Sequence, residues 1–197
     1  MASVPFPLPL PTRRSPRLKG FDYTAAGAYF LTVCTRDKDC ILAEIRDGRS
    51  IPSDIGQAVE RSWHQISSHF PDVSCDEFIV MPNHVHGILF IHPPPEEMPH
   101  PPVGARHAVP APPPQAESFG RPVAASLPTI IRSFKAAATK DVRSIARRSD
   151  FRLWQRGYYE HVIRHNKELD NIRRYIKDNP AKWESDGENP WRSLLRD

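Results

Sequence analysis

The sequence predicts an α+β fold, an antiparallel sheet of the ferredoxin-like or RRM-like kind with helices on one face. Short apolar runs rich in strand-forming residues recur along the chain, and two of them flank a tight turn at residues 82–83. Segments with apolar residues at helical spacing lie between these runs. The resulting order, β-α-β-β-α-β-α, is that of a ferredoxin-like sandwich followed by one more helix. Such a fold serves many functions, so the chemistry must be sought in particular residues.

Composition favours a soluble protein with a polyanionic partner. The chain has 197 residues and a net charge of +4, with a pI of about 9.1. Three cysteines, Cys34, Cys40 and Cys75, form neither a disulfide framework nor a zinc-type spacing, which is typical of a reducing compartment. No apolar run approaches membrane length, and prolines interrupt the N-terminal apolar stretch where a signal peptide needs a continuous core. We therefore expect a cytoplasmic protein without membrane contact.

Proline-rich stretches divide the chain. Residues 1–20 are predicted to be a disordered start followed by a basic arm. The cations of the arm are either merely solvated or, beside a nucleic-acid site, in contact with phosphates; they are Arg13, Arg14, Arg17 and Lys19. Residues 21–197 are predicted to be a single domain. At about residues 92–126 the tripeptide PPP occurs twice, which predicts a flexible insertion.

The first half of the domain is predicted to hold two extended pieces and a helix. Residues 28–35 (AYFLTVCT) read as the first strand, and residues 40–45 as a short second extended piece. Apolar side chains then recur at helical spacing through residues 53–70. They are Ile55, Val59, Trp63, Ile66 and Phe70. This segment is therefore expected to pack one face on the sheet.

A β-hairpin follows and carries two histidines. Residues 75–81 (CDEFIVM) and 87–91 (GILFI) are apolar runs, and Pro82 with Asn83 has the composition of a turn. Because side chains alternate along a strand, His84 and His86 project from the same face. That geometry suits two imidazoles holding one metal ion. Taken alone, however, a pattern this short more often marks two core or surface histidines.

A second helix is predicted at residues 127–148. Ile130, Ile131, Phe134, Ala138, Val142 and Ile145 fall on its inner side. The other side is basic, with Arg132, Lys135, Lys140 and Arg143 among its residues. A basic face is commonly just a solvated one. Beside a nucleic-acid site it would contact the DNA backbone, which is the interpretation favoured here.

The last predicted elements are a strand at residues 154–164 and a helix at residues 166–180. Asn166 suits the N-cap of that helix and Pro180 its end. Tyr175 and Asn179, four residues apart, lie on the same side of the helix, at the edge of its apolar face. On structural grounds alone, such a tyrosine usually just packs, and an asparagine before proline usually just ends the helix.

These residues carry a resemblance to a known family. The segments HVH (84–86), WQRGYYEHVIR (154–164) and YIKDNP (175–180) resemble the HUH-type single-tyrosine transposases. They are most similar to the REP-associated tyrosine transposases, which act on single-stranded DNA. The segments RRSPRLKGFDYTAAGAYFLTVCT (13–35) and MPNHVHGILF (81–90) are also similar to that family. The resemblance implies a histidine pair on the central sheet, with the tyrosine-bearing helix laid against it.

The resemblance also implies a mechanism and a substrate. Tyr175 would attack a phosphodiester and form a 5′-phosphotyrosine link, from which another 3′-hydroxyl could rejoin DNA. A divalent ion, Mg²⁺ or Mn²⁺, held by His84, His86 and the carboxamide of Asn179 would act as the Lewis acid. The expected partner is single-stranded DNA folded into palindromic hairpins, acted on by a monomer or a homodimer. Tyr158 and Tyr159 are competing candidates for the nucleophile.

Two alternatives from other classes remain open. A non-catalytic module that binds single-stranded nucleic acid would need the basic surfaces but not Tyr175, and the RNP aromatic pattern is lacking. A histidine-metal hydrolase or oxygenase would need a carboxylate or a third histidine, and none stands out in the sequence. Metal-dependent covalent attachment to DNA distinguishes the transposase from both.

Overall fold

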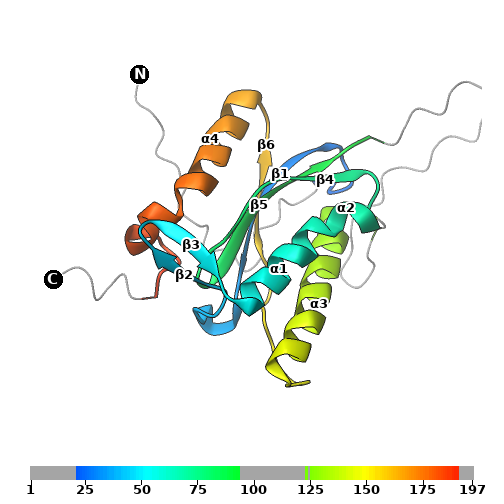
Figure 1. Ribbon diagram of the computed structural model, residues 1–197. Helices are drawn as coiled ribbons and strands as arrows, with labels where there is room; N and C mark the ends of the chain where they lie inside the picture. The colour runs from blue at the N-terminus through cyan, green and yellow to red at the C-terminus, as the bar shows by residue number, and fades with distance from the viewer. Residues whose placement is uncertain (1–20, 94–122, 124, 191–197) are drawn as a thin grey trace, which may run out of the picture.

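The computed structural model describes residues 21–93, 123 and 125–190 (Figure 1). The predicted disordered start and its basic arm lie outside the described residues, as does most of the predicted insertion. The elements are, in chain order, β1 (Gly27–Cys34), the 3-10 helix η1 (Arg36–Lys38), β2 (Ala43–Arg46), β3 (Arg49–Pro52), α1 (Asp54–His64), α2 (Ile66–His69), β4 (Val73–Val80), β5 (His84–Ile91), α3 (Leu127–Ala146), β6 (Tyr159–Ile163), α4 (Asn166–Asp178) and the 3-10 helix η2 (Pro180–Ser185).

The main sheet has four antiparallel strands in the order β4-β5-β1-β6. The connection from β1 to β4 carries α1, and the connection from β5 to β6 carries α3. This is the β-α-β-β-α-β arrangement of ferredoxin-like domains, so the predicted fold class is confirmed. In the register of β1 and β5, Cys34 lies opposite His84 and Thr32 opposite His86.

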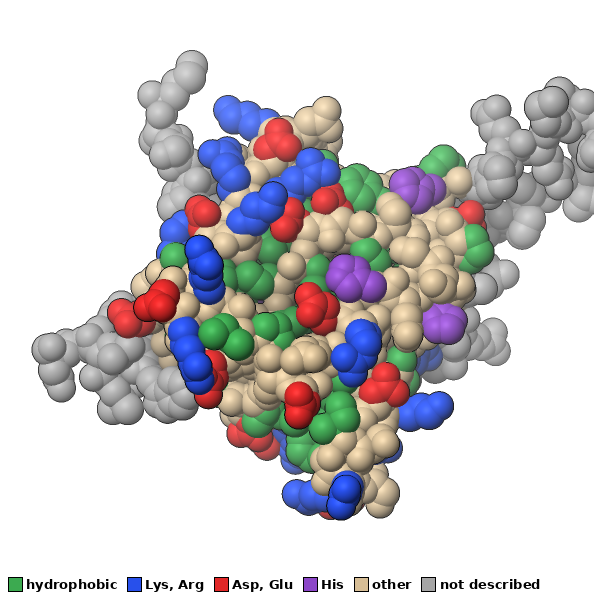
Figure 2. Space-filling model, in the orientation of Figure 1, with side chains coloured by type: hydrophobic (Ala, Val, Ile, Leu, Met, Phe, Trp, Pro, Cys, Tyr) green, Lys and Arg blue, Asp and Glu red, His purple; other side chains and the backbone are tan. Residues whose placement is uncertain are grey.

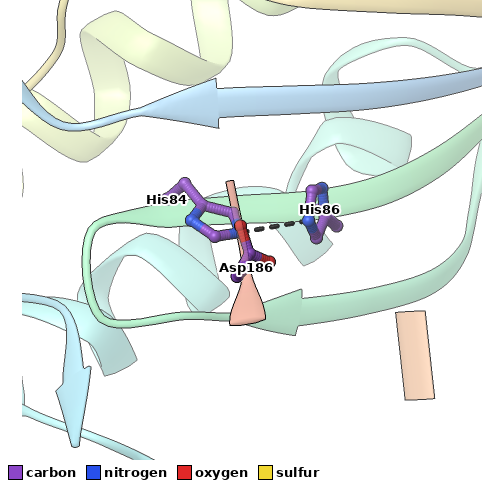
Figure 3. Close-up of side chains that lie close together, drawn as sticks. All are labelled: His84, His86 and Asp186. Carbon is purple, nitrogen blue, oxygen red and sulfur yellow. Dashed lines mark hydrogen bonds between the residues drawn. The ribbon is translucent and has the colours of Figure 1, made fainter. Parts of the chain in front are cut away.

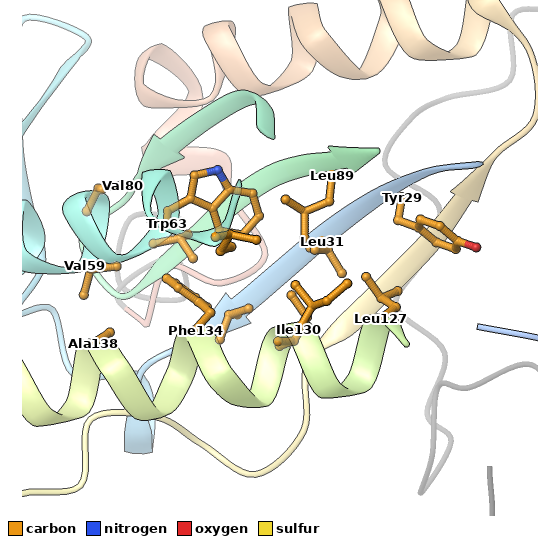
Figure 4. Packing of buried hydrophobic residues seen from close by; sticks show 14 of the residues in the cluster. Tyr29, Leu31, Val59, Trp63, Val80, Leu89, Leu127, Ile130, Phe134 and Ala138 are labelled. Carbon is orange, nitrogen blue, oxygen red and sulfur yellow. The ribbon is translucent and has the colours of Figure 1, made fainter. Parts of the chain in front are cut away.

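One face of the sheet is covered by α1 and α3 (Figure 4). Trp63 of α1 and Phe134 of α3 meet edge to face, with their ring centroids 5.4 Å apart, above Leu31 and Leu89 of the sheet. Gly87 allows this close packing, because a Cβ at that position would come within 2.3 Å of the Trp63 ring. The glycine between the second histidine and the apolar run of β5 is therefore a packing requirement.

The opposite face is covered by α4 (Figure 1). Ile172 and Ile176 of α4 are fully buried against Phe30 of β1 and Ile88 of β5. The predicted single helical layer thus consists of α1 and α3, while the C-terminal helix forms a second layer. Because β1 and β5 are buried on both faces, their sequences read as nearly continuous apolar runs.

Polar contacts tie α4 to both edges of the sheet. A register shift in β4 between Cys75 and Phe78 marks a bulge at Asp76 and Glu77. Asp76 accepts hydrogen bonds from Arg173, and Glu77 forms an ion pair with Lys177 at 3.1 Å. At the other edge, His161 of β6 lies 2.7 Å from a carboxylate oxygen of Glu168. The helix that carries Tyr175 is therefore held from two sides.

Three predicted elements differ in extent from those observed. The extended piece at residues 40–45 becomes β2, which pairs with β3 in a separate two-stranded sheet. Asp47 and Gly48 join these strands with positive φ angles of 51° and 68°, as a tight hairpin turn requires. The helix predicted at residues 53–70 is divided into α1 and α2. Of the strand predicted at residues 154–164, only β6 joins the sheet, although Trp154 forms an isolated bridge with Thr35.

Candidate metal and tyrosine site

Two buried histidines project from β5 toward the face that α4 covers. His84 and His86 are 0% and 3% exposed, and their Nε2 atoms lie 3.0 Å apart. Val85 between them points the other way, into the core beneath α1 and α3. The alternation predicted for this hairpin is thus present, and it brings the two imidazole rings together.

Asn83 sets the tautomer of His84. The Asn83 amide nitrogen donates to the backbone carbonyls of Glu188 and Lys38, at 2.8 and 3.2 Å. Its Oδ1 atom therefore faces His84 Nδ1, 2.9 Å away, and accepts a hydrogen bond from that nitrogen. With the proton on Nδ1, the lone pair of His84 Nε2 is directed into the site.

His86 is oriented by Thr32, and both rings are neutral. The Thr32 hydroxyl lies 2.9 Å from His86 Nδ1, which leaves Nε2 facing His84. Burial lowers the pKa of His84 to about 3, and the charge of Lys38 adds to the effect. Burial, followed by the neighbouring His84, also holds the pKa of His86 well below its usual value. Neutral imidazoles are the form that binds a metal ion.

Tyr175 of α4 reaches His86. Its hydroxyl lies 3.4 Å from His86 Nε2, and its ring packs edge to face with Phe30. Burial raises the pKa of the Tyr175 phenol, and the charge of Asp186 raises it further. The hydroxyl is therefore protonated in this state, and its ionisation needs a favourable charge nearby.

Asn179, the C-cap residue of α4, lies one turn beyond Tyr175. A hydrogen bond with the Asn179 side chain acts on the Tyr175 phenol and partly offsets the rise in its pKa. Asn179 is only 2% exposed, and its Oδ1 atom has no hydrogen-bond partner among the described residues. A buried carbonyl oxygen left in this state is costly unless a donor or a cation satisfies it.

The structure adds Asp186, which the sequence prediction missed. Nitrogen atoms of His84 and His86 and a carboxylate oxygen of Asp186 lie within 4.8 Å of one another (Figure 3). The Asp186 Oδ1 atom accepts a hydrogen bond from the Glu188 backbone N–H at 2.7 Å. The acidic segment ESDGE (184–188), which begins in η2 a few residues after the tyrosine helix, is the signal in the sequence that could have pointed to this carboxylate.

These residues fit a divalent cation. Two nitrogens bound to one ion at about 2.1 Å, at right angles, would lie about 3.0 Å apart, and 3.0 Å is the distance between the two Nε2 atoms. The Asp186 carboxylate supplies negative charge, and the partnerless Asn179 oxygen could supply a further donor. Mixed nitrogen and oxygen donors are compatible with Mn²⁺ or Mg²⁺.

The other tyrosines differ in their placement. Tyr158 packs with the hydrophobic cluster beneath α1 and α3, on the face away from the histidines. Tyr159 packs with the cluster beneath α4, and its ring centroid is 6.3 Å from that of Phe30. Of these two competitors, only Tyr159 lies on the same face as Tyr175.

The predicted DNA-contacting residues of α3 lie on the face opposite to the histidines. Lys135 donates to the carbonyls of Gln155 and Gly157, and Arg143 donates to the carbonyl of Phe151. Arg132 donates to Thr129, and Lys140 is exposed. DNA contact by these four residues remains a prediction, and two of them also hold the segment that leads to β6. In the view of Figure 2, Lys and Arg side chains gather over α4.

No protein-family profile matches the chain. A solved REP-associated tyrosine transposase bound to a REP hairpin is similar, with 19% identity and a TM-score of 0.48, covering 80% of this chain and 68% of that one. A candidate transposase from Deinococcus radiodurans is similar with 15% identity and a TM-score of 0.42, covering 82% and 97%.

Within the described residues, every helix falls short of the length and apolar character that crossing a membrane requires. A curated protein of Haemophilus influenzae, described as uncharacterized, is similar to the chain in sequence. The two are 38% identical over 176 residues, which cover 88% of this chain and 91% of that protein. Identity at this level over most of both sequences shows that the chain belongs to the same family as the Haemophilus influenzae protein.

Proposed function

We propose that the protein is a metal-dependent endonuclease and strand transferase that acts on single-stranded DNA hairpins, with Tyr175 as its nucleophile. The observation that carries this proposal is the position of the Tyr175 hydroxyl, 3.4 Å from His86 Nε2, beside two neutral imidazoles whose Nε2 atoms are 3.0 Å apart. A nucleophile and a cation site thus adjoin one another in a buried setting. This is the arrangement that cleavage of an anionic phosphodiester requires.

His84, His86 and Asp186 would hold the divalent ion, with Asn179 as a further oxygen donor. When bound, the ion supplies Lewis-acid stabilisation of the negative charge that develops on the phosphate oxygens. Asn83 and Thr32 keep the two imidazoles in the orientation that presents Nε2 to the site. The ion pairs of α4 with β4 fix the helix from which Tyr175 projects.

The chemical step exchanges one phosphodiester for another. The Tyr175 phenol loses its proton to solvent, its oxygen attacks phosphorus, and the bond from phosphorus to the 3′-oxygen breaks. The departing 3′-oxygen takes up a proton, and the 5′-phosphate stays on the tyrosine. Because the ester bond is retained, a second 3′-hydroxyl can reverse the step on another strand, and no nucleotide cofactor is consumed.

The choice of hairpin DNA rests on the sequence motifs similar to REP-associated tyrosine transposases. The charge of the molecule supports an anionic partner, because the net charge is +4 and Lys and Arg side chains gather over the helix that carries Tyr175 (Figure 2). The cations on α4 are Lys167, Arg173, Arg174 and Lys177. We propose that the chain acts as a monomer or a homodimer in the cytoplasm.

A second candidate function gains support from Asp186. Two histidines and one carboxylate are also the donors of many hydrolytic and non-haem iron sites. A hydrolase would cut DNA through water, leaving no link between the protein and the strand. The tyrosine hydroxyl beside His86 favours the covalent reaction over hydrolysis by water.

The decisive experiment incubates the protein with a labelled single-stranded hairpin oligonucleotide and Mn²⁺, followed by a denaturing gel. A covalent adduct is expected for the wild type, and it should disappear in Tyr175→Phe and on chelation of the metal. Tyr158→Phe, on the far side of the sheet, is the matched control and should still form the adduct.

Each other outcome points to a specific alternative. An adduct that persists in Tyr175→Phe and is lost in Tyr159→Phe would move the nucleophile to β6. Cleavage without an adduct would identify a hydrolase. Tight binding without cleavage, for several hairpin sequences, would identify a non-catalytic binding module.

A further inference from the structure

The segment after η2 is bound to three separate parts of the chain through one residue, Glu188. Glu188 is only 9% exposed, although it is a carboxylate near the chain's C-terminal end. Its carboxylate lies 3.2 Å from Lys38 Nζ of η1 and accepts a hydrogen bond from the Cys34 thiol at 3.5 Å. Its backbone carbonyl accepts a hydrogen bond from Asn83, in the turn between β4 and β5.

The same segment carries Asp186 to the histidines. The Glu188 backbone N–H binds Asp186 Oδ1, and this hydrogen bond fixes one oxygen of the carboxylate that lies beside the two histidines. The side chain and the backbone of Glu188 therefore act together. The side chain fixes where the segment lies, and the backbone fixes how the Asp186 carboxylate is turned.

The chemistry of the Glu188 contacts favours a stable attachment of this segment to η1 and β1. Burial, and next the charge of Glu188, raise the pKa of the Cys34 thiol, so the thiol stays protonated and donates its hydrogen. Cys34 is also the residue paired with His84 in the sheet. Glu188 thus binds directly to the strand position opposite the first histidine.

We infer that Glu188 is the positioning residue of the metal site: by binding Lys38 and Cys34, it holds Asp186 where it completes the ligand set of His84 and His86. This inference rests on the proposed function, because it assumes that a divalent ion binds at the two histidines. Loss of a group that orients a metal ligand typically costs about 10–100-fold in metal affinity.

The test is Mn²⁺ binding by the full-length metal-free protein, measured by the electron paramagnetic resonance of free Mn²⁺. Glu188→Gln keeps an acceptor for Cys34 but removes the charge that binds Lys38, so its Mn²⁺ affinity should fall about tenfold. Lys38→Gln removes the other partner and should give a similar loss. The double variant should be no worse than either single one, because both remove the same contact.

Glu184→Gln is the matched control, since it removes the same charge from an exposed residue of η2, four positions away. Its Mn²⁺ affinity should equal that of the wild type. Co²⁺ absorption spectra of the variants provide a second readout, because a displaced carboxylate alters the ligand field whereas a merely structural change elsewhere does not. Thermal unfolding without metal checks that Glu188→Gln and Glu184→Gln are both folded at the temperature of the titration.

The outcomes separate this inference from the proposed function. If the wild type binds no Mn²⁺, or if His84→Ala binds it equally well, the proposed function fails. If His84→Ala abolishes binding while Glu188→Gln and Lys38→Gln match Glu184→Gln, only the role of Glu188 is wrong. Tighter Mn²⁺ binding or faster cleavage in Glu188→Gln would also overturn the inference, because the segment would then obstruct the site.

Discussion

Arg173 of α4 donates to Asp76 in the bulge of β4, with 2.9 Å between the guanidinium Nε and the carboxylate Oδ2. This contact joins the edge strand to the helix two residues before Tyr175. Lys177, two residues after Tyr175, binds Glu77 from the same bulge. The irregularity in β4 therefore supplies two anchors that flank the proposed nucleophile.

Removing one anchor should affect catalysis more than stability. Asp76→Asn removes the negative charge from the pair with Arg173. The side chains of Asp76 and Arg173 are 20% and 37% exposed, so the loss in unfolding free energy should be only about 0.2–1 kcal/mol. Tyr175 would be held less firmly, and small misplacements at a reacting group can cost up to about a hundredfold in rate. Adduct formation measured against time should be at least about tenfold slower. Asp178→Asn, an exposed residue of the same helix, should cleave normally; equal rates for the two variants would contradict the prediction.

The two oxygen donors should both contribute to metal affinity. Asp186→Asn and Asn179→Ala are each expected to weaken Mn²⁺ binding by about tenfold or more. The first removes the carboxylate charge beside the histidines, and the second removes a buried oxygen that has no hydrogen-bond partner among the described residues. The measurement is a Mn²⁺ titration of the metal-free protein. Asn171→Ala, an exposed position on α4, serves as the control. If Asn179→Ala bound Mn²⁺ like the wild type yet cleaved poorly, Asn179 would be a partner of Tyr175 and no ligand.

Gly87 should tolerate no side chain. In Gly87→Ala the new methyl group would meet the Trp63 ring at 2.3 Å, so we expect a loss of about 1–3 kcal/mol in unfolding free energy, as for other overpacked cores. Urea unfolding followed by tryptophan fluorescence measures this loss. Gly27→Ala is the control, since its nearest contact would be an ordinary 3.8 Å. The double variant Trp63→Phe/Gly87→Ala should lose less unfolding free energy than the sum of the losses in the two single variants. Full additivity would mean that the two residues do not clash.

Glu168 should make the unfolding free energy depend on pH in the acidic range. Burial acts to raise its pKa, but hydrogen bonds from the Arg164 backbone N–H and the His161 ring outweigh it, so the pKa of Glu168 is lowered on folding. A carboxyl group with a lowered pKa stabilises the fold above its unfolded pKa of about 4.3. That stability is lost as the pH falls through the folded value. Between pH 6 and pH 3, the unfolding free energy measured with urea should therefore change less with pH for Glu168→Gln than for the wild type. Glu184→Gln should follow the wild type, and a Glu168→Gln curve parallel to it would refute the linkage.

Much of the site could be predicted from local periodicity. The two-residue repeat of a strand places His84 and His86 on one face, and the four-residue repeat of a helix places Tyr175 and Asn179 on one side. The structure shows both alignments. Local patterns were sufficient here because each pair lies within a single element.

Features that depend on distant contacts could not be predicted in this way. Asp186 lies in a segment without periodicity, and its place is set by the contacts of Glu188 with residues about 105–155 positions away. Lys135 and Arg143 look like solvated cations in sequence, yet they donate to backbone carbonyls of the loop that follows α3, at separations of 20 and 8 residues. The second helical layer could have been predicted from the sequences of β1 and β5. Both strands are almost uniformly apolar, whereas a sheet with one solvent-exposed face would show alternating polar residues.

The wide separation of the site residues along the chain has a consequence for the timing of activity during translation. His84 and His86 leave the ribosome about a hundred residues before Asp186 and Glu188. A nascent chain with its first strands already folded would thus hold the imidazoles but neither Tyr175 nor the carboxylate. If the proposed function holds, newly made protein would not cut nearby single-stranded DNA until the segment that holds Glu188 has emerged and docked.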